Sequence, residues 1–394
     1  METSVASSKW QPTGVPTIYK MMEALDQSGH EPFFIFVCKE TYMPFVGKKD
    51  RVLSIEGLRH PVYLVACRCQ EGPFRKYIND GLQTLILLDL VRWWKPHVAY
   101  FSNANFLAAA LSARLTRVPT VLRLMGVYPA ERRVLNQKGM AAGIIRWAYR
   151  SPFSLVVCTQ DGSGGEYWLQ KAMRSETPTK LLVNGYSLPS ELPEIDPRLR
   201  ELPEGATVVT HVGKLEHDKG AVEFTEGFLR ALKRVGGGLH ALIVGVGTMG
   251  GKIQNMVKEA SAQDRVTLVD RLPHEQIPWV HRLTSVFVSL NRLGNLSNAN
   301  LEAMRAGCCM VLPRSQLANG IDEATDRLVP QDAALRISSP CDVEGIADAL
   351  VFLHQHPEMR DHMKLRMAEA AVSFIPSWKE RVDQEMQLIE SLVE

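Results

Sequence analysis

Short apolar runs alternate with longer amphipathic segments along almost the whole chain. Glu31–Lys39 (EPFFIFVCK), Tyr63–Cys67 and Thr120–Leu124 are apolar runs bounded by turn residues, which is typical of buried strands. Residues 74–95 and Phe106–Leu115 read as helices. Strands that alternate with helices favour parallel sheets covered by helices on both faces. The pattern therefore predicts an α/β protein with doubly wound parallel sheets.

The pattern is weakest at the N-terminus. The run METSVAS at residues 1–7 is barely a strand, and a turn at Gln11–Pro16 and a helix over Thr17–Gln27 follow it. We therefore expect either a short first strand or a start of the protein that lies upstream of Met1.

A proline-rich stretch divides the chain into two halves. Residues 187–205 (SLPSELPEIDPRLRELPEG) hold four prolines and many charges, and no hydrophobic period persists through them. Such a composition is typical of a linker between domains. We predict four parts: a first Rossmann-like domain over 1–187, a linker over 188–205, a second Rossmann-like domain over 206–375 and a last amphipathic helix over 376–394.

The stretch from residue 285 to 313 combines the features of a phosphate-binding unit. It predicts a strand, a polar turn, a helix that opens at Leu301, and a second strand. In α/β proteins this arrangement presents backbone N–H groups to a phosphate. Within the turn, Asn295, Ser297 and Asn298 tolerate unusual backbone angles, cap helices and offer hydrogen bonds.

Glu302 is expected inside the first turn of that helix, near the positive end of its dipole. A carboxylate there could accept hydrogen bonds from two hydroxyls of a ribose. The alternative is that Glu302 only complements the helix dipole, and the spacing alone leaves both interpretations open.

Bulk composition limits the classes of function. With 45% hydrophobic and 22% charged residues, the 394-residue chain has the composition of a globular protein with two or three domains. A net charge of +2 gives no signature of nucleic-acid binding, and no stretch approaches the roughly 18–20 apolar residues of a membrane span. The seven cysteines form no CxxC pair that would bind a metal. Buried thiols and the lack of a signal pattern predict a cytoplasmic protein.

One hypothesis for the second half is a dinucleotide site. Gly245-x-Gly247-x-x-Gly250 follows a strand and opens a helix, and Asp270 ends the next strand, where its carboxylate could bind a ribose hydroxyl. This hypothesis makes the protein a nicotinamide-dependent oxidoreductase. It gives no role to the lysines that follow the preceding strand.

Eight segments, in order along the chain, are together similar to the motifs of retaining glycosyltransferases of family 4, which have the GT-B fold. They are Gly29-His30-Glu31, Lys95-Pro96-His97-Val98, Asn184-Gly185, Gly213-Lys214-Leu215-x-x-x-Lys219-Gly220, Leu242-Ile243-Val244-Gly245-x-Gly247, Arg265 to Pro273, Glu302-Ala303-Met304-x-Ala306-Gly307, and Phe374 to Glu394 with Trp378. The resemblance covers nearly the whole chain. It implies two Rossmann-like domains facing across a cleft, and a C-terminal helix that crosses back to pack on the first domain.

The resemblance also implies a donor substrate, a nucleoside-diphosphate sugar with UDP or GDP as the nucleotide, and no separate cofactor or metal. Lys214 and Lys219 would contact the diphosphate, together with backbone amides around Ser297 and Asn298. Fixed positive charge stabilises the negative charge that grows on the leaving oxygen as the glycosidic bond breaks. Glu302 would bind the ribose.

Further positions follow from the same resemblance. Arg271 and Leu272 would line the base pocket, largely through their backbone. Gly14 would keep the first loop close to the donor phosphates. The remaining positions expected at the nucleotide are Gly213, Gly245, Gly247 and Asn295.

Two positions depart from the family pattern. The helix motif of the family is a Glu-x7-Glu pair, and the residue eight positions before Glu302 is Gly294. Where family members often place a His before Gly, this chain has Met125. The donor sugar and the choice between retention and inversion therefore stay open, with Asn295 or Asn298 as uncharged replacements. A third hypothesis follows: a GT-B-shaped nucleotide-binding protein without transferase activity.

The first domain is expected to bind the acceptor, a glycan or a lipid-linked glycan. Basic and aromatic residues interleave in it, as on surfaces that rest on an anionic membrane. This pattern suggests peripheral contact with the inner face of the membrane; the alternative is that the tryptophans are half-buried core residues. The positions are Arg75, Lys76, Arg92, Trp93, Trp94, Lys95, Arg132, Arg133, Lys138, Arg146, Trp147 and Arg150.

Overall fold

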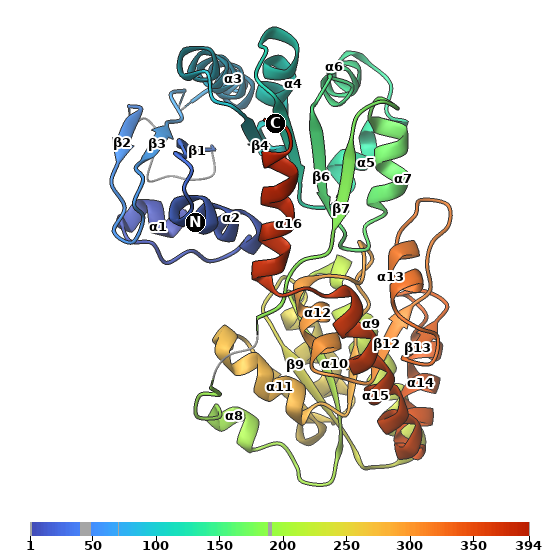
Figure 1. Cartoon of the computed structure of the whole chain (residues 1–394). Helices are drawn as coiled ribbons and strands as arrows, with labels where there is room; N and C mark the ends of the chain where they lie inside the picture. The colour runs from blue at the N-terminus through green and yellow to red at the C-terminus, as the bar shows by residue number, and fades with distance from the viewer. Residues whose placement is uncertain (1, 40–48, 70, 188–190, 394) are drawn as a thin grey trace.

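The chain forms two α/β lobes in a computed structural model that describes residues 2–39, 49–69, 71–187 and 191–393 (Figure 1). The first lobe holds the strands between residues 34 and 182, and the second holds those between 207 and 337. The predicted α/β class is confirmed.

The second lobe is built on a six-stranded parallel sheet with strand order β10-β9-β8-β11-β12-β13. Its strands are β8 (Thr207–Val212), β9 (Leu239–Val244), β10 (Val266–Val269), β11 (Val286–Val288), β12 (Met310–Pro313) and β13 (Ala334–Ile337). Its helices are α9 (Ala221–Val235), α10 (Gly250–Glu259), α11 (Ile277–Leu283), α12 (Asn298–Arg305), α13 (Glu323–Leu328), α14 (Val343–Gln355) and α15 (Pro357–Phe374).

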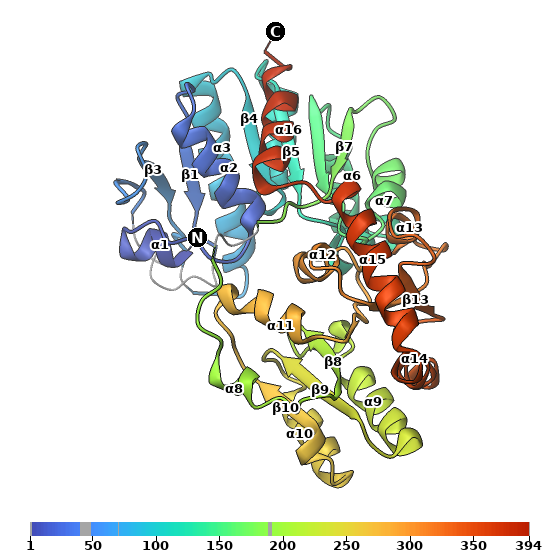
Figure 2. The ribbon, with the colours of Figure 1, turned by 60° about the horizontal axis from the view of Figure 1, so that its bottom comes forward.

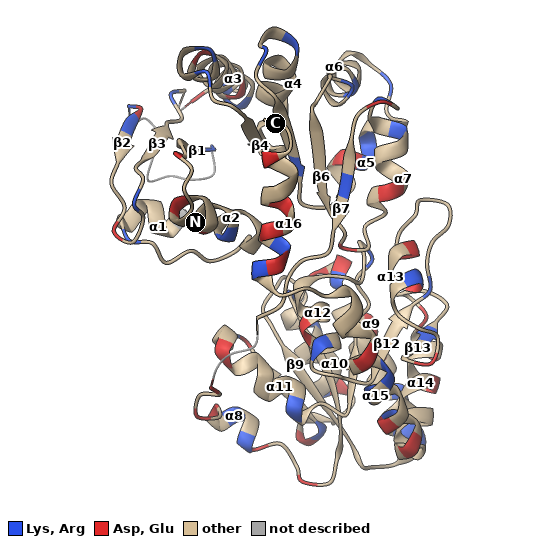
Figure 3. Ribbon diagram, viewed as in Figure 1, with Lys and Arg blue, Asp and Glu red and all other residues tan. Residues whose placement is uncertain are grey.

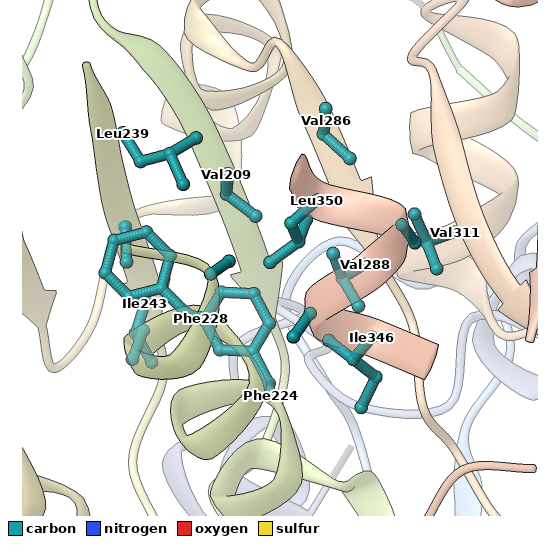
Figure 4. Close-up of a cluster of buried hydrophobic side chains, with 14 of the residues drawn as sticks. Val209, Phe224, Phe228, Leu239, Ile243, Val286, Val288, Val311, Ile346 and Leu350 are labelled. Carbon is teal, nitrogen blue, oxygen red and sulfur yellow. The ribbon is translucent and has the colours of Figure 1, made fainter. Parts of the chain in front are cut away.

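The core of the second lobe lies between this sheet and two long helices. Phe224 and Phe228 of α9 pack with Val209 of β8 (Figure 4). Ile346 and Leu350 of α14 complete the cluster, and all five side chains are buried. The two residues from each helix follow the i, i+4 spacing of a helix face.

The first lobe contains two separate sheets rather than one parallel sheet. Strands β4 (Ala99–Ser102), β5 (Thr120–Leu124), β6 (Leu155–Thr159) and β7 (Thr179–Leu182) are parallel. Strands β1 (Phe34–Val37) and β3 (Val62–Val65) are also parallel, but β2 (Arg51–Leu53) runs antiparallel to β3. The prediction of exclusively parallel strands is therefore wrong at β2.

Helices of the first lobe follow the prediction more closely. They are α1 (Glu2–Ser7), α2 (Pro16–Gln27), α3 (Arg75–Trp94), α4 (Phe106–Leu115), α5 (Pro129–Asn136), α6 (Met140–Tyr149) and α7 (Gly165–Ala172). Helix α1 stands where the sequence left open a short first strand or a start upstream of Met1, and α5 was not predicted. Of the proposed linker, positions 188–190 lie outside the described residues; the rest contains α8 (Pro197–Arg200) and contacts α11, since the Trp279 indole N–H donates to the Pro193 carbonyl at 2.8 Å.

The last helix, α16 (Trp378–Glu390), returns from the second lobe to the first. Figure 1 and Figure 2 both show it beside the strands of the first lobe. Its Glu385 carboxylate lies 3.1 Å from the Arg123 guanidinium of β5 and 2.8 Å from Arg381, and it accepts a 2.7 Å hydrogen bond from the Tyr100 hydroxyl. At most 1% of the side chains of the three charged residues is exposed. The predicted return of the C-terminal helix is thus anchored by a buried ion cluster.

Candidate active site

Two loops meet at the carboxyl ends of β8 and β9. The Gly213 N–H donates to the Val244 carbonyl at 3.0 Å, and the Leu215 N–H donates to the Val246 carbonyl at 2.9 Å. A Cβ on Gly245 would lie 1.8 Å from the Gly213 oxygen. Glycine at 245 is therefore required by the approach of the two backbones.

The other glycines expected at the nucleotide differ in their surroundings. A Cβ on Gly247 would lie 2.3 Å from the Leu215 oxygen, so this position too is closed by backbone. Gly213 and Gly14 have open space where a Cβ would stand. Gly14 is exposed and lies two residues before α2.

Lys219 lies beside the end of β11, because its loop packs on that strand's C-terminal extension. A Cβ on Gly220 would be 2.4 Å from the Leu290 Cβ, and the Arg292 N–H donates to the Asp218 carbonyl at 2.9 Å. The Lys219 ammonium is 3.5 Å from the Asp218 carboxylate. Lys214 is exposed near Glu216, whose pKa is lowered by hydrogen bonds from Thr248 and, more weakly, by Lys214.

The turn before α12 is held by a buried polar network. Asn295 is fully buried. Its side-chain amide donates to the Asn291 carbonyl and, at 2.6 Å, to the Asp322 carboxylate, and its oxygen accepts from the Ser289 hydroxyl at 2.7 Å. The expectation that the Asn295 side chain binds the nucleotide is therefore corrected: this side chain fixes the shape of the turn.

Helix α12 begins at Asn298, with Ser297 as its N-cap, three residues earlier than the sequence suggested. Across the described ranges, no acceptor meets the backbone N–H groups of Asn298 and Ala299. The positive end of the helix dipole and these unused donors favour an anion at this position. The Asn298 side chain turns toward the first lobe, where its oxygen accepts from the Asn184 amide at 2.8 Å.

Glu302 is the fifth residue of α12, so its predicted place in the first turn is wrong. Its carboxylate lies 2.9 Å from the His274 ring nitrogen, and this hydrogen bond raises the pKa of His274. A cavity of about 240 Å³ opens beside it, lined by Tyr186, His274, Ile277, Pro278, His281 and Glu302 among others. Tyr19 of α2 lies near, since burial, Glu23 and Glu302 raise its pKa.

The two residues expected at the nucleobase lie on the loop after β10. Arg271 is exposed, and its carbonyl accepts from the Arg198 guanidinium at 3.2 Å. Leu272 packs against the cluster that includes Val269 and Val280. Among the described residues, no hydrogen bond joins either side chain to the His274–Glu302 pair.

The two lobes touch directly at the turn that precedes α12. The Leu296 N–H donates to the Asp161 carbonyl at 3.0 Å, and the Asp322 N–H donates to the Gly162 carbonyl at 2.7 Å. A Cβ on Gly294, whose φ is +127°, would lie 2.4 Å from the carbonyl carbon of Gly162. The position where the family pattern has its first Glu therefore has no room for a side chain.

Two carboxylates at this contact were not singled out in the sequence. Burial raises the pKa of Asp161 to about 6, and burial also raises the pKa of Asp322 to about 6. Asp322 is occupied by hydrogen bonds from Thr325 and Asn295. The available signal for Asp161 was its place just after a parallel strand, at the carboxyl edge where α/β proteins bind ligands.

Buried histidines of the second lobe are neutral. Burial lowers the pKa of His211 to about 4 and that of His281 to about 4. The His211 ring packs on Phe224, which makes it part of the core. Among the described residues, no group of three or more His, Cys, Asp and Glu side chains is arranged to hold a metal ion.

Comparisons with known proteins place this geometry in a class. Residues 194–369 match the family model described as "Glycosyl transferases group 1". The chain is 28% identical over 234 residues to the 2-deoxystreptamine N-acetyl-D-glucosaminyltransferase of Streptomyces fradiae, which is 55% of each chain. It is 25% identical over 210 residues to the 2-deoxystreptamine glucosyltransferase of Streptomyces kanamyceticus, covering 51% of this chain and 54% of that one. The matches span about half the length of these relatives.

Solved structures agree over a larger part of the chain. Sucrose-phosphate synthase of Thermosynechococcus elongatus superposes with a TM-score of 0.70 at 17% identity, covering 96% of this chain and 94% of that one. Anabaena HepE in complex with UDP and glucose gives 0.60 at 15% identity, covering 84% and 86%. Similarity at these identities concerns the fold, which is GT-B.

Fold and family model together define the class: the chain has the GT-B fold, and residues 194–369 of its second lobe are similar to glycosyl transferases of group 1. The matched residues include Gly245, Gly247 and Gly250, which favours the glycosyltransferase interpretation of this loop over the oxidoreductase interpretation.

Proposed function

We propose that this protein transfers a sugar from a nucleoside-diphosphate sugar to a hydroxyl of a glycan or lipid-linked acceptor, with retention at the anomeric carbon. The observation that supports this most strongly is the packing of the Lys219 loop on the segment that leads into the turn before α12. Leu290 and Arg292 make these contacts, with Gly220 and Asp218 on either side of Lys219.

This arrangement suits a diphosphate. The backbone N–H groups of Asn298 and Ala299 would donate to its oxygens, and the Lys219 ammonium would balance its charge. Lys is a compact point charge, so Lys219 and Lys214 would attract the diphosphate without the bidentate geometry of Arg. Glu302, with the cavity beside it, would receive the ribose if the His274 ring gives way to the sugar hydroxyls.

UDP and GDP sugars are the donors to test first. HepE of Anabaena, which shares the fold, has been determined with UDP and with UDP-glucose. The direct experiment is calorimetry of the purified chain with UDP, GDP and ADP and their sugar conjugates, followed by transfer to an acceptor extract. Transfer with the donor that binds supports the proposal, and NMR of the product's anomeric proton distinguishes retention from inversion. Binding without transfer or donor hydrolysis would favour the nucleotide-binding protein without transferase activity.

The first lobe has the charge expected of a surface that meets anionic molecules. Residues 1–187 hold 23 Lys and Arg against 14 Asp and Glu, while the whole chain has a net charge of only +2. Figure 3 shows Lys and Arg at α3, α5 and α7 of this lobe. Phe74, Tyr77 and Trp93 on or beside α3 are 67%, 73% and 75% exposed, so Trp93 is not a core residue.

We therefore propose that α3 contacts an anionic membrane when the acceptor is lipid-linked. None of the described helices is both long and apolar enough to span a bilayer, so the contact would be peripheral. Flotation with vesicles containing phosphatidylglycerol tests it: Tyr77→Ser with Trp93→Ser should reduce co-flotation. A wild-type protein that stays at the bottom of the gradient rules this contact out and leaves a free glycan as the acceptor.

A further inference from the structure

Asp161 lies between Met125 and Gly294, the two positions where this chain lacks the sugar-facing residues of the family pattern. It follows β6, and its carboxylate Oδ1 accepts from the Ser163 N–H at 3.0 Å. A Cβ on Gly126 would lie 2.1 Å from its Oδ2, so the carboxylate rests against the Met125-Gly126 segment. On the other side, its carbonyl accepts from Leu296 and would be 2.6 Å from a Cβ on Gly294.

The main chain of Asp161 lies next to the helix start proposed to bind the diphosphate. Its carbonyl accepts from the Leu296 N–H, one residue before Ser297, the N-cap of α12. Tyr128 lies near carboxylates of both lobes. Burial raises the pKa of its phenol to about 12, and Asp161 and, more weakly, Asp218 of the second lobe add to this shift. Asp218 is in turn 3.5 Å from the Lys219 ammonium. Asp161 of the first lobe and Asp218 of the second thus both act on the pKa of Tyr128.

Asp161 is half-buried, whereas Asp322 on the other side of the contact is 1% exposed and hydrogen-bonded by Asn295 and Thr325. In a donor whose diphosphate binds at the start of α12, the sugar ring is attached to the second phosphate. The turn at Gly294 carries no side chain that could meet that ring, because the backbone of the first lobe closes this position.

We propose that Asp161 binds a hydroxyl of the transferred sugar and so supplies, from the first lobe, the carboxylate that the second lobe lacks at Gly294. This inference rests on the proposed function. A carboxylate with few competing partners makes strong hydrogen bonds to hydroxyls. Because the residue belongs to the first lobe, the sugar would also connect the two lobes when the donor is bound.

The raised pKa of Asp161 at the lobe contact agrees with this position. Burial raises the pKa of Asp161 to about 6, the Ser163 hydrogen bonds lower it, and Asp322 raises it further. Strongly shifted groups that face a substrate space are candidates for function. Arg132, the neighbouring cation, donates to the Asn319 carbonyl at 3.2 Å and to the Ser163 carbonyl, so its hydrogen bonds go to backbone.

The competing explanation is that Asp161 only shapes the turn before α7, through its bond to Ser163. The two roles differ in what they do to ligands. A turn-shaping residue would affect donor and nucleotide alike, or the stability alone. A sugar-binding residue would affect the sugar nucleotide and leave the bare nucleoside diphosphate unchanged.

The test compares Asp161→Asn with Arg327→Gln, a control that breaks the exposed Arg327–Glu166 ion pair between the same lobes without touching Asp161. Calorimetry uses UDP and UDP-glucose, and GDP and GDP-mannose. We expect Asp161→Asn to bind the diphosphate within about twofold of the wild type, and to bind the sugar nucleotide and transfer its sugar at least about tenfold less well. Wild-type protein should bind one deoxy analogue of the sugar nucleotide about tenfold less well than the full sugar nucleotide. Asp161→Asn should bind that analogue and the full sugar nucleotide equally.

Equal losses for diphosphate and sugar nucleotide, or an equal loss in Arg327→Gln, would overturn the inference. So would an unchanged affinity of Asp161→Asn for the sugar nucleotide. If Asp161→Asn does not fold, Asp161→Ser, which retains an acceptor for the Ser163 N–H, carries the test. The two levels stay separable: wild-type protein that binds no nucleoside diphosphate contradicts the proposed function itself, whereas intact diphosphate binding with no sugar-dependent effect contradicts only the role of Asp161.

Discussion

At the contact between the lobes, the residue type is limited by the close approach of two backbones rather than by side-chain chemistry. Gly294 has a positive φ and meets the main chain of residues 161–163 at distances that exclude a Cβ. The sequence marks this residue as a departure from a motif, but it cannot give the reason, since the obstructing atoms come from a turn more than 130 residues away. The reason for glycine is therefore visible only in the folded chain.

Replacing Gly294 should separate the lobes locally. Gly294→Ala is expected to lower stability by about 2 kcal/mol or more, because strain at positive φ and a backbone collision both oppose it. Differential scanning calorimetry measures the change. Gly251→Ala is the matched control, since it lies in α10 with no atom within 4 Å of its Cβ and should be neutral or slightly stabilising. A native melting temperature for Gly294→Ala would contradict this packing.

Asp161 should make stability depend on pH in a defined direction. Its pKa in the folded protein is about 6, above the ordinary 3.8 expected on unfolding. A raised carboxyl pKa stabilises the fold fully below pH 3.8, and this contribution is lost as the pH rises through 6. Relative to Asp161→Asn, wild-type protein should therefore lose up to about 3 kcal/mol between pH 4 and 7. Parallel stability profiles of the two proteins would refute the shift.

The sequence identified some site residues for reasons that differ from their observed contacts. Gly245 and Gly247 were expected at the nucleotide, and they are also needed where two loops are hydrogen-bonded to each other. Asn295 was expected to face a ligand, but it bonds to Asp322, a partner 27 positions away that no spacing rule points to. A short sequence motif predicts where a turn lies, but it does not predict which distant residues bond to that turn.

At the level of elements, long periodic segments were predicted well. Helix α4 and strand β5 match the expected ranges, because apolar periodicity is decided by the chain's own side chains. The short pieces differed. Strand β2 contains Arg51 and pairs antiparallel at an edge, and α12 starts in a polar Asn-Ala-Asn segment that has no apolar period. Whether such short segments form a strand or a helix, and where they begin, depends on partners elsewhere in the chain.

The return of α16 should depend on its buried charge cluster. Glu385→Gln leaves Arg123 and Arg381 buried without a counter-charge, and we expect it to cost about 3–5 kcal/mol of stability. Urea unfolding followed by circular dichroism measures this. Glu390→Gln on the same helix is the control, since its pair with His30 is exposed and should contribute less than about 1 kcal/mol. Equal effects of the two substitutions would show that the buried cluster does not anchor the helix.

For the whole molecule, the central claim is that a diphosphate binds between Lys219 and the start of α12, between two lobes of different charge. The family model matches residues 194–369, most of the second lobe. The two-lobed fold was predicted from the repeated strand–helix pattern and the resemblance to GT-B enzymes. The contact between the lobes was not, because it consists of backbone bonds between turns.

Calorimetric titration of wild-type protein, Lys219→Ala and Lys233→Ala with UDP and GDP tests the central claim most directly. Lys233 is an exposed lysine near the far end of α9, the helix that follows the Lys219 loop, and serves as the control for lost charge. We predict that one of the two nucleotides binds, that Lys219→Ala weakens it by about 10- to 100-fold, as expected for a charged hydrogen bond, and that Lys233→Ala leaves it unchanged. Equal affinity in all three proteins, or no binding of either nucleotide, would contradict the account.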